Sequence, residues 1–210
     1  MTSLDIGRAA LSATPTRLLQ EVWDAYGDGS CVLASMQDAV LIELAMRVSR
    51  RFPIVFVDTG YHFDETWQTL RAVERRYGIS VEVIEPLRPV EAHVAAGQCC
   101  ADKAAQLDLA LDGRQAWVSG VQRHQTRARS KASLVELDRR GLTKVNPLAQ
   151  WSEADRARFI DDQNVIVNPL LEQGYTSIGC APCTTLPALD DDSRSGRWAG
   201  MEKTECGLHL

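Results

Sequence analysis

Short apolar runs recur along the chain and predict buried strands. They lie at 31–34, 54–57, 81–84 and 116–119, and a fifth strand is expected at 143–146. Runs of this length, bounded by polar or turn-forming residues, are typical of strands in a parallel sheet that is covered on both faces.

The segments between these runs carry apolar residues at helical spacing. The pattern predicts helices over 39–50 and 63–77, and the end of an amphipathic helix over 18–26. Ser152 followed by Asp155 predicts a further helix start, because a serine cap and an acidic residue three positions later satisfy each other's backbone groups. Strands alternating with helices predict an α/β fold with a mostly parallel central sheet and helices on both faces.

Polar loops follow three of the predicted strands. In parallel sheets ligands bind beyond the carboxyl ends of the strands, so we expect these loops to converge on one crevice suited to a nucleotide. The loop residues expected to face the ligand are Ser35, Gln37, Asp38, Asp58, Thr59, Gly60 and Gly120.

Length and composition predict one domain. The chain has 210 residues, of which 45% are hydrophobic, enough for a full core and too few for two. We assign the α/β domain to residues 1–189. Residues 190–210, which begin with a polar stretch of small residues, are expected to form a mobile C-terminal tail of the same domain.

The charge balance narrows the function classes. A net charge of −5 disfavours a general nucleic-acid binder, but local clusters of basic residues, such as 123–131, suit a small anionic ligand. No apolar run is long enough to cross a bilayer, and residues 1–15 do not read as a signal peptide. We therefore expect a cytoplasmic protein without a membrane partner.

Six cysteines make up the most informative feature of the sequence. Cys99 and Cys100 are adjacent, and Cys180 and Cys183 form a CxxC pair. Four thiolates can ligate zinc or an iron–sulfur cluster. Adjacent side chains tend to point apart, which suits separate iron atoms better than one zinc ion, so the spacing favours a 4Fe–4S cluster.

Other interpretations of the cysteines remain open at this point. The adjacent pair can be ordinary helix residues, with only the CxxC pair functional, and the CxxC pair can be a thioredoxin-like redox motif. Cys31 lies inside an apolar run and is expected to belong to the core.

Cys206 stands alone near the end of the chain. A nucleophilic cysteine must be a thiolate, and His209, Arg194 and Arg197 can supply the positive charge that favours this form. The competing interpretation is a solvent-exposed cysteine without a role.

The chain resembles the adenylyl-sulfate reductases of bacteria and plants, within the adenine nucleotide alpha-hydrolase-like group. The resemblance rests on the ordered cysteine motifs Cys99-Cys100, Cys180-Ala181-Pro182-Cys183 and Glu205-Cys206-Gly207-Leu208-His209. Similar segments also occur at 35–38, 56–60, 174–183 and 194–198. Relatives that reduce the 3′-phosphorylated nucleotide generally lack the four cluster cysteines, so the resemblance favours adenylyl sulfate as substrate.

The resemblance implies a two-stage reaction in sulfate assimilation. The Cys206 thiolate attacks the sulfate sulfur and AMP leaves, and thioredoxin then releases sulfite from the Cys206 thiosulfonate. By the same resemblance Arg194 and Arg197 bind the phosphosulfate, His209 closes beside it, and Arg123 and Arg129 match basic positions of the substrate loop. The cysteines Cys99, Cys100, Cys180 and Cys183 would hold a 4Fe–4S cluster that orders the site.

This sequence departs from the family pattern at several positions. Lys103 and Ala104 stand where an Arg-Lys pair is usual, Gln122 stands in place of a common arginine, and Arg127 in place of a common proline. We expect Lys103 partly to replace the family lysine near the cluster and the substrate.

Three alternatives compete with this interpretation. A PP-loop adenylating or sulfur-transfer enzyme would need a glycine-rich loop, and 35–38 lacks the glycines. The second alternative is a reductase of 3′-phosphoadenylyl sulfate. The third is a non-catalytic iron–sulfur or zinc protein that binds a nucleotide. The sequence leaves the oligomeric state open, a homo-oligomer included.

Overall fold

The computed structural model describes residues 14–91, 94–188, 194–198 and 201. Six strands form one sheet in the order β3-β2-β1-β4-β6-β5. All neighbouring strands run parallel except β5, which pairs antiparallel with β6 at the edge. The strands are β1 (Ser30–Ala34), β2 (Ile54–Val57), β3 (Glu82–Ile84), β4 (Ala116–Ser119), β5 (Val135–Leu137) and β6 (Thr143–Val145).

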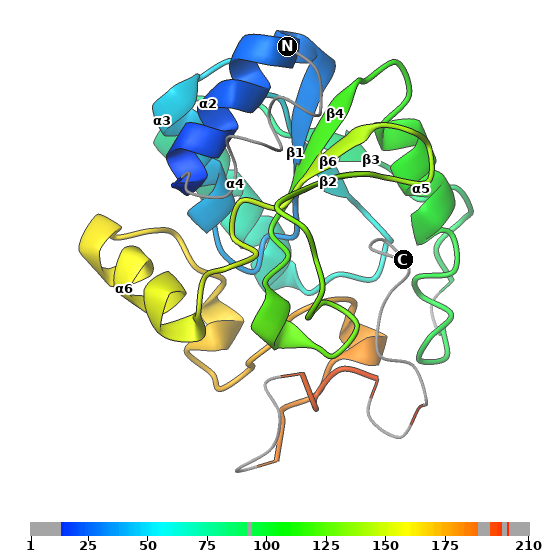
Figure 1. Ribbon diagram of the computed structural model, residues 1–210. Helices are drawn as coiled ribbons and strands as arrows, with labels where there is room; N and C mark the ends of the chain where they lie inside the picture. The colour runs from blue at the N-terminus through cyan, green and yellow to red at the C-terminus, as the bar shows by residue number, and fades with distance from the viewer. Residues whose placement is uncertain (1–13, 92–93, 189–193, 199–200, 202–210) are drawn as a thin grey trace.

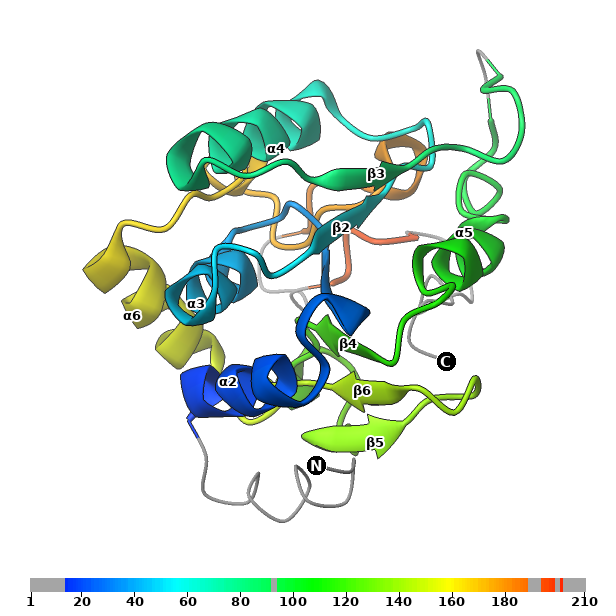
Figure 2. The same ribbon diagram turned by 90° about the horizontal axis from the view of Figure 1, so that it is seen from above.

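Helices cover both faces of the sheet, which confirms the predicted α/β fold. The α-helices are α2 (Pro15–Tyr26), α3 (Val40–Val48), α4 (Asp64–Tyr77), α5 (Lys103–Ala110) and α6 (Glu153–Gln163). Figures 1 and 2 show α2, α3 and α4 on one face and α5 on the other, with α6 beyond α3. None of these helices, in the part of the chain that the structure describes, is long and apolar enough to cross a membrane.

The two-residue period of the strands divides the core between the two faces. Val32 and Phe56 pack with α2, α3 and α4 in the larger cluster of buried residues. Leu33 and Val57, one position further along their strands, belong to the second cluster with residues of α5. Cys31 is fully buried in this second cluster, and burial raises the pKa of its thiol to about 12. The prediction that Cys31 is a core residue is confirmed.

Local hydrogen bonds and tertiary pairing account for the differences from the predicted elements. The helix expected over 39–50 begins at Val40, because the Asp38 carboxylate accepts a hydrogen bond from the Val40 amide at 2.9 Å. Strand β5 was not predicted. Its three residues carry too little pattern by themselves, and they are held by pairing with β6 and by an ion pair between Glu136 and Lys144 at 2.9 Å.

Gln106 of α5 ties the carboxyl ends of β2 and β3 together. Its side chain is 1% exposed, and its Nε2 group donates to the backbone carbonyls of Asp58, Ile84 and Glu85. These carbonyls lie at the edge of the sheet where the chain passes from strand to loop, so Gln106 holds the first residues of the loops after β2 and β3.

We predict that Gln106→Ala lowers the free energy of unfolding by about 3 kcal/mol, since it leaves buried carbonyls without their donor and opens a cavity. Urea titration measures the change. Gln68→Ala, at an exposed position of α4, is the matched control, with an expected effect within about 0.5 kcal/mol. Equal effects of the two substitutions would contradict the role given to Gln106.

Candidate functional site

A pocket opens at the carboxyl ends of β1, β2 and β4. Its floor is made by the last residues of these strands and the first residues after them: Leu33, Ala34, Ser35, Phe56, Val57 and Gly120. The loops after β1 and β4 line the pocket, as predicted for both. The turn at 58–60 does not line it, so the expectation that all three loops meet in one crevice is only partly correct.

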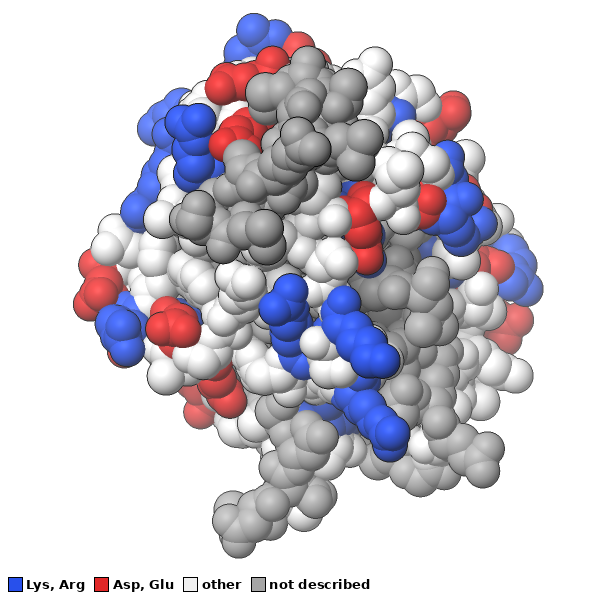
Figure 3. Space-filling model, in the orientation of Figure 1, with Lys and Arg blue, Asp and Glu red and all other residues white. Residues whose placement is uncertain are grey.

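One end of the pocket is positively charged. Arg194 and Arg197, from the segment 194–198, lie at this end, and Lys103 of α5 and Arg129 of the loop after β4 also line the pocket. In Figure 3, Lys and Arg side chains gather near the middle of the face, where the loops after β4 lie in Figure 1. A chain of net negative charge thus places its cations where an anionic ligand would enter.

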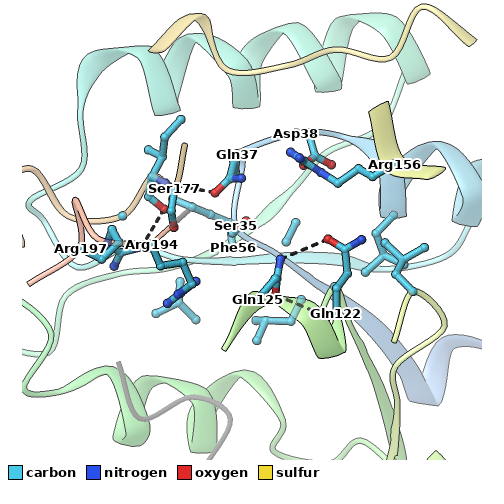
Figure 4. Close-up of a pocket in the computed structure, with 18 of the residues that line it drawn as sticks. Ser35, Gln37, Asp38, Phe56, Gln122, Gln125, Arg156, Ser177, Arg194 and Arg197 are labelled. Carbon is cyan, nitrogen blue, oxygen red and sulfur yellow. Dashed lines mark hydrogen bonds and ion pairs between the residues drawn. The ribbon is translucent and has the colours of Figure 1, made fainter. Parts of the chain in front are cut away.

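An ion pair occupies the opposite end. Figure 4 shows Arg194 and Arg197 at one end of the pocket and Asp38 with Arg156 at the other. Arg156 donates to Asp38 Oδ2 through Nε at 3.0 Å and Nη2 at 2.6 Å. Arg156 was not predicted as a site residue, because it lies on α6, far along the chain from Asp38. Because Arg156 neutralises Asp38, the pocket has a charged end and a neutral end.

A glutamine pair holds part of the wall. The two side chains of Gln122 and Gln125 bond to each other at 3.2 Å, and Gln125 Oε1 accepts from Arg129 Nη1 at 2.6 Å. Gln122 is 2% exposed, and its Nε2 has no hydrogen-bond partner within the described ranges. Gln125 was not predicted as a site residue from the sequence. Gln122 was noted only as a departure from the family pattern. The pair orients Arg129 and leaves a donor beside the pocket.

His62 also lines the pocket and was not predicted. Burial lowers the pKa of His62 to about 4, and the positive charge of Lys103 acts in the same direction. The ring is therefore neutral near pH 7. Its Nε2 group lies 3.2 Å from the Val57 carbonyl and must donate to it, which leaves Nδ1 as a buried acceptor.

The two cysteine pairs meet beside the charged end of the pocket. Cys99, Cys100, Cys180 and Cys183 form one buried cluster with Trp198, and the Sγ atoms of Cys99 and Cys183 are 2.8 Å apart. The turn before α5 supplies the first pair, and the 3-10 helix η5 (Ala181–Cys183) holds part of the second. The Gly97 amide donates to Cys183 Sγ at 3.0 Å.

The cysteine cluster offers four thiol donors to a metal cofactor. In the described part of the chain no group of three or more His, Cys, Asp or Glu side chains is arranged to hold a metal ion. The fit to an iron–sulfur cluster therefore rests on the number and type of the donors and on their enclosure by apolar residues. A hydrogen bond from Cys99 lowers the pKa of Cys180, and the Lys103 charge lowers it further.

The turn after β2 borders the cysteines. Thr59 Oγ1 lies 3.2 Å from Cys180 Sγ, while the Asp58 carboxylate accepts a hydrogen bond from the Gly60 amide at 2.7 Å. Gly60 has φ 77, and a Cβ there would also clash with Val90. The assignment of Asp58, Thr59 and Gly60 to substrate binding stays a prediction. Their observed contacts include Cys180, the turn itself and, for the Asp58 carbonyl, Gln106.

Other predicted site residues lie away from the pocket wall or outside the described residues. The Arg123 guanidinium donates to the Ala132 carbonyl at 2.9 Å, and Arg123 is not among the residues that line the pocket. Cys206 and His209 lie outside the described residues. The same holds for residues 189–193, which include the first part of the polar stretch. The roles of Cys206 and His209, and the division at residue 189, stay predictions.

Comparison with known proteins identifies similar sequences and folds. The family model described as "Phosphoadenosine phosphosulfate reductase domain" matches residues 31–186. An adenosine 5'-phosphosulfate reductase of Rhodococcus erythropolis is 44% identical over 219 residues, covering 94% of this chain and 89% of the relative. One of Mycolicibacterium smegmatis is 42% identical, covering 97% of this chain and 92% of the relative.

Solved structures share the fold at lower identity. A phosphoadenylyl-sulfate reductase of Candida auris superposes with a TM-score of 0.68 at 19% identity, covering 87% of this chain and 96% of that chain. An FMN adenylyltransferase of Candida glabrata gives a TM-score of 0.64 at 16% identity, covering 86% and 63%. The fold therefore occurs in proteins with different nucleotide chemistry. The fold alone does not define the reaction, which depends on the residues of the site.

We predict that Arg156→Gln lowers the free energy of unfolding by about 1–2 kcal/mol, because Asp38 would lose its partner in a setting where both side chains are less than one-fifth exposed. Adding Asp38→Asn should recover about 1 kcal/mol, since the amide oxygen can still cap Val40. Thermal or urea unfolding of the single and double variants measures this coupling.

Arg158→Gln, on the same helix, is the control for this cycle. Arg158 lies 3.9 Å from Asp155, and its side chain is 70% exposed. Its loss is expected to cost no more than about 0.5 kcal/mol. Additive effects of Arg156→Gln and Asp38→Asn would show that the pair is not energetically coupled.

Proposed function

The chain belongs to the phosphoadenosine phosphosulfate reductase family, and we propose that it reduces adenylyl sulfate to sulfite and AMP in sulfate assimilation. One observation carries the proposal: the cationic end of the pocket adjoins the buried four-cysteine cluster. The relatives named adenosine 5'-phosphosulfate reductase, which match nearly the whole chain, support the same substrate. The chain is accordingly an oxidoreductase acting on a sulfur group.

The charge gradient of the pocket orients the proposed substrate. The phosphosulfate group carries the negative charge, so it belongs at the end where Arg194 and Arg197 lie, and Lys103 and Arg129 line the same pocket. The adenosine belongs toward the neutral end, and Leu41, Phe56 and Leu148 give the pocket apolar surface. This orientation brings the sulfur atom to the side of the pocket next to the cysteines.

The proposed chemistry begins with the thiolate of Cys206. It attacks the sulfur of adenylyl sulfate, the bond from that sulfur to the bridging oxygen breaks, and AMP leaves with the electron pair. The product on the protein is a Cys206 thiosulfonate. The arginines stabilise the charge that collects on the bridging oxygen and on the sulfonyl oxygens, and His209 closes beside them.

Thioredoxin completes the reaction in this proposal. One thioredoxin thiolate attacks Sγ of Cys206 and sulfite leaves, which forms a mixed disulfide. The second thioredoxin thiol then releases Cys206 as a thiol, and thioredoxin ends as a disulfide. The two electrons that reduce sulfate to sulfite thus come from thioredoxin. A thiol reductant of this kind fits a cytoplasmic location.

We further propose that Cys99, Cys100, Cys180 and Cys183 hold a 4Fe–4S cluster. The donor set supports it: four thiols from two segments, buried together, with Lys103 nearby to balance the negative charge of the thiolates. When bound, the group would supply structural order and a local electric field at the charged end of the pocket. The presence of all four cysteines also favours adenylyl sulfate over its 3′-phosphorylated form.

Sulfite release from adenylyl sulfate in the presence of thioredoxin tests the function, and Cys206→Ser tests the mechanism. We expect the variant to lose at least about 99% of turnover, because a neutral hydroxyl is a far weaker nucleophile than a thiolate. It should still bind the nucleotide. Mass spectrometry of the wild type with substrate and without thioredoxin should show a sulfonate on the Cys206 peptide.

Cys31→Ala is the control, because Cys31 is buried on the α5 side of the sheet and does not line the pocket. It is expected to keep turnover. A sulfonate on another cysteine, or a Cys206→Ser variant that still releases sulfite, would overturn the mechanism. Wild-type protein that releases no sulfite from adenylyl sulfate would overturn the proposed function itself.

Metal content tests the proposed cluster. Protein purified without oxygen should contain about four irons per chain and absorb in the visible range, and Cys100→Ser should lose most of both. Loss of the cluster is expected to lower thermal stability as well, since four thiolates from distant segments would lose their common partner. Stoichiometric zinc without iron in the wild type would contradict the assignment.

A further inference from the structure

Trp198 lies between the cysteine cluster and the charged end of the pocket. Its side chain is 3% exposed and belongs to the same buried cluster as the four cysteines. Its backbone has φ 54, in the left-handed region that a bulky residue rarely adopts. Such a conformation persists only where surrounding contacts enforce it.

Two of the pocket arginines lie over this one ring. The guanidinium carbon of Arg197 is 4.4 Å from the ring centroid of Trp198, and that of Arg194 is 5.5 Å away. The indole face is the best aromatic partner for a cation, and the interaction is strongest when it is shielded from water. Both arginines line the pocket, so their shared support is this indole.

Arg197 is enclosed on its other side as well. A Cβ at Gly179 would overlap the Arg197 guanidinium, so the absence of a side chain at this position admits the cation. Arg197 Nη1 donates to the Ile178 carbonyl at 3.2 Å, while its Nε is buried without a partner in the described part of the chain. The guanidinium therefore sits in a slot formed by Trp198 and Gly179.

Backbone contacts anchor the slot to the CxxC segment. The Trp198 amide donates to the Cys183 carbonyl at 3.0 Å, and the Thr185 amide donates to the Gly196 carbonyl at 2.8 Å. Thr184 and Arg197 form an antiparallel bridge between these two contacts. The ring is thus held in place by the same segment that supplies two of the cysteines.

We propose that Trp198 is a positioning residue that presents Arg194 and Arg197 to the anionic group of the ligand. A long arginine side chain loses rotamer entropy on binding unless it is already ordered, and stacking on a fixed ring supplies that order beforehand. Trp198 itself need not touch the ligand. This inference rests on the proposed function for the identity of the ligand, but not for the arrangement of the two arginines.

Trp198→Leu, Trp198→Phe and Gly179→Ala test the proposal. The leucine variant removes the ring, and the alanine variant displaces Arg197 while it leaves the ring and the cysteines unchanged. We expect both to weaken the binding of adenylyl sulfate about tenfold, since they remove a shielded cation–π arrangement, and to leave the weaker binding of adenosine unchanged. The phenylalanine variant should recover most of the affinity, and iron content should stay the same in Gly179→Ala.

A second measurement does not depend on the substrate. Phenylglyoxal modifies exposed guanidinium groups, and peptide mass spectrometry follows its rate at Arg197. The slot should make this rate slow in the wild type and in Trp198→Phe, and clearly faster in Trp198→Leu and Gly179→Ala. Trp151→Leu is the matched control, because Trp151 packs against Phe159 on α6 and does not line the pocket. The control should keep the slow rate.

The outcomes separate the two proposals. If the wild type does not bind adenylyl sulfate, the proposed function fails. The rates of phenylglyoxal modification at Arg197 still test whether Trp198 and Gly179 hold this side chain. If Trp198→Leu does not fold, Gly179→Ala and Trp198→Phe decide. Unchanged modification rates and unchanged affinity in Gly179→Ala would overturn the positioning role, and so would an equal loss of affinity for adenylyl sulfate and adenosine in Trp198→Leu.

Discussion

The common direction of β1, β2, β4 and β6 is the constraint on which the rest of the molecule depends. Parallel strands release their chains at the same edge, so loops that are distant in sequence emerge side by side. Each central strand is buried on both faces, which makes the sheet interior apolar and leaves the carboxyl edge as the place for polar groups. The pocket floor consists of the ends of β1, β2 and β4, and the buried amide of Gln106 bonds to the carbonyl that follows β2 and to two carbonyls at the end of β3.

The cysteine cluster lies beside the cationic end of the pocket, and this proximity gives the site its electrostatic character. Lys103 lines the pocket and also lies close enough to lower the pKa of both His62 and Cys180. Trp198 belongs to the same buried cluster as the cysteines, and two pocket arginines lie over its ring. A change in the cysteine segment would therefore be felt by the cations of the pocket through direct contact, with no need for a long pathway.

The positions of the charged side chains determine the charge of the pocket more than the net charge of the chain does. The chain is acidic overall, yet the only carboxylate among the described residues that line the pocket, Asp38, is neutralised by Arg156. The other cations of the pocket, Lys103, Arg129, Arg194 and Arg197, lie in a partly buried setting, where their field is less screened than at the surface. A protein of net charge −5 can therefore carry a local group of cations whose charge is suited to a small anion.

The sequence by itself determined the α/β class, the strands of the parallel sheet and the core position of Cys31, because burial on both faces leaves a local apolar signature that needs no tertiary information. It also singled out the cysteine motifs and most of the basic residues that line the pocket, since these residue types carry their chemistry with them. Tertiary structure alone decided which of them meet. The pairing of Asp38 with Arg156 joins residues 118 positions apart, and Cys99 and Cys183 are separated by 84. The turn at Thr59 faces the cysteines instead of the pocket, and β5 exists only through its partner strand. Contacts of this kind depend on how the helices and loops pack against the sheet, and one-dimensional spacing does not encode that packing.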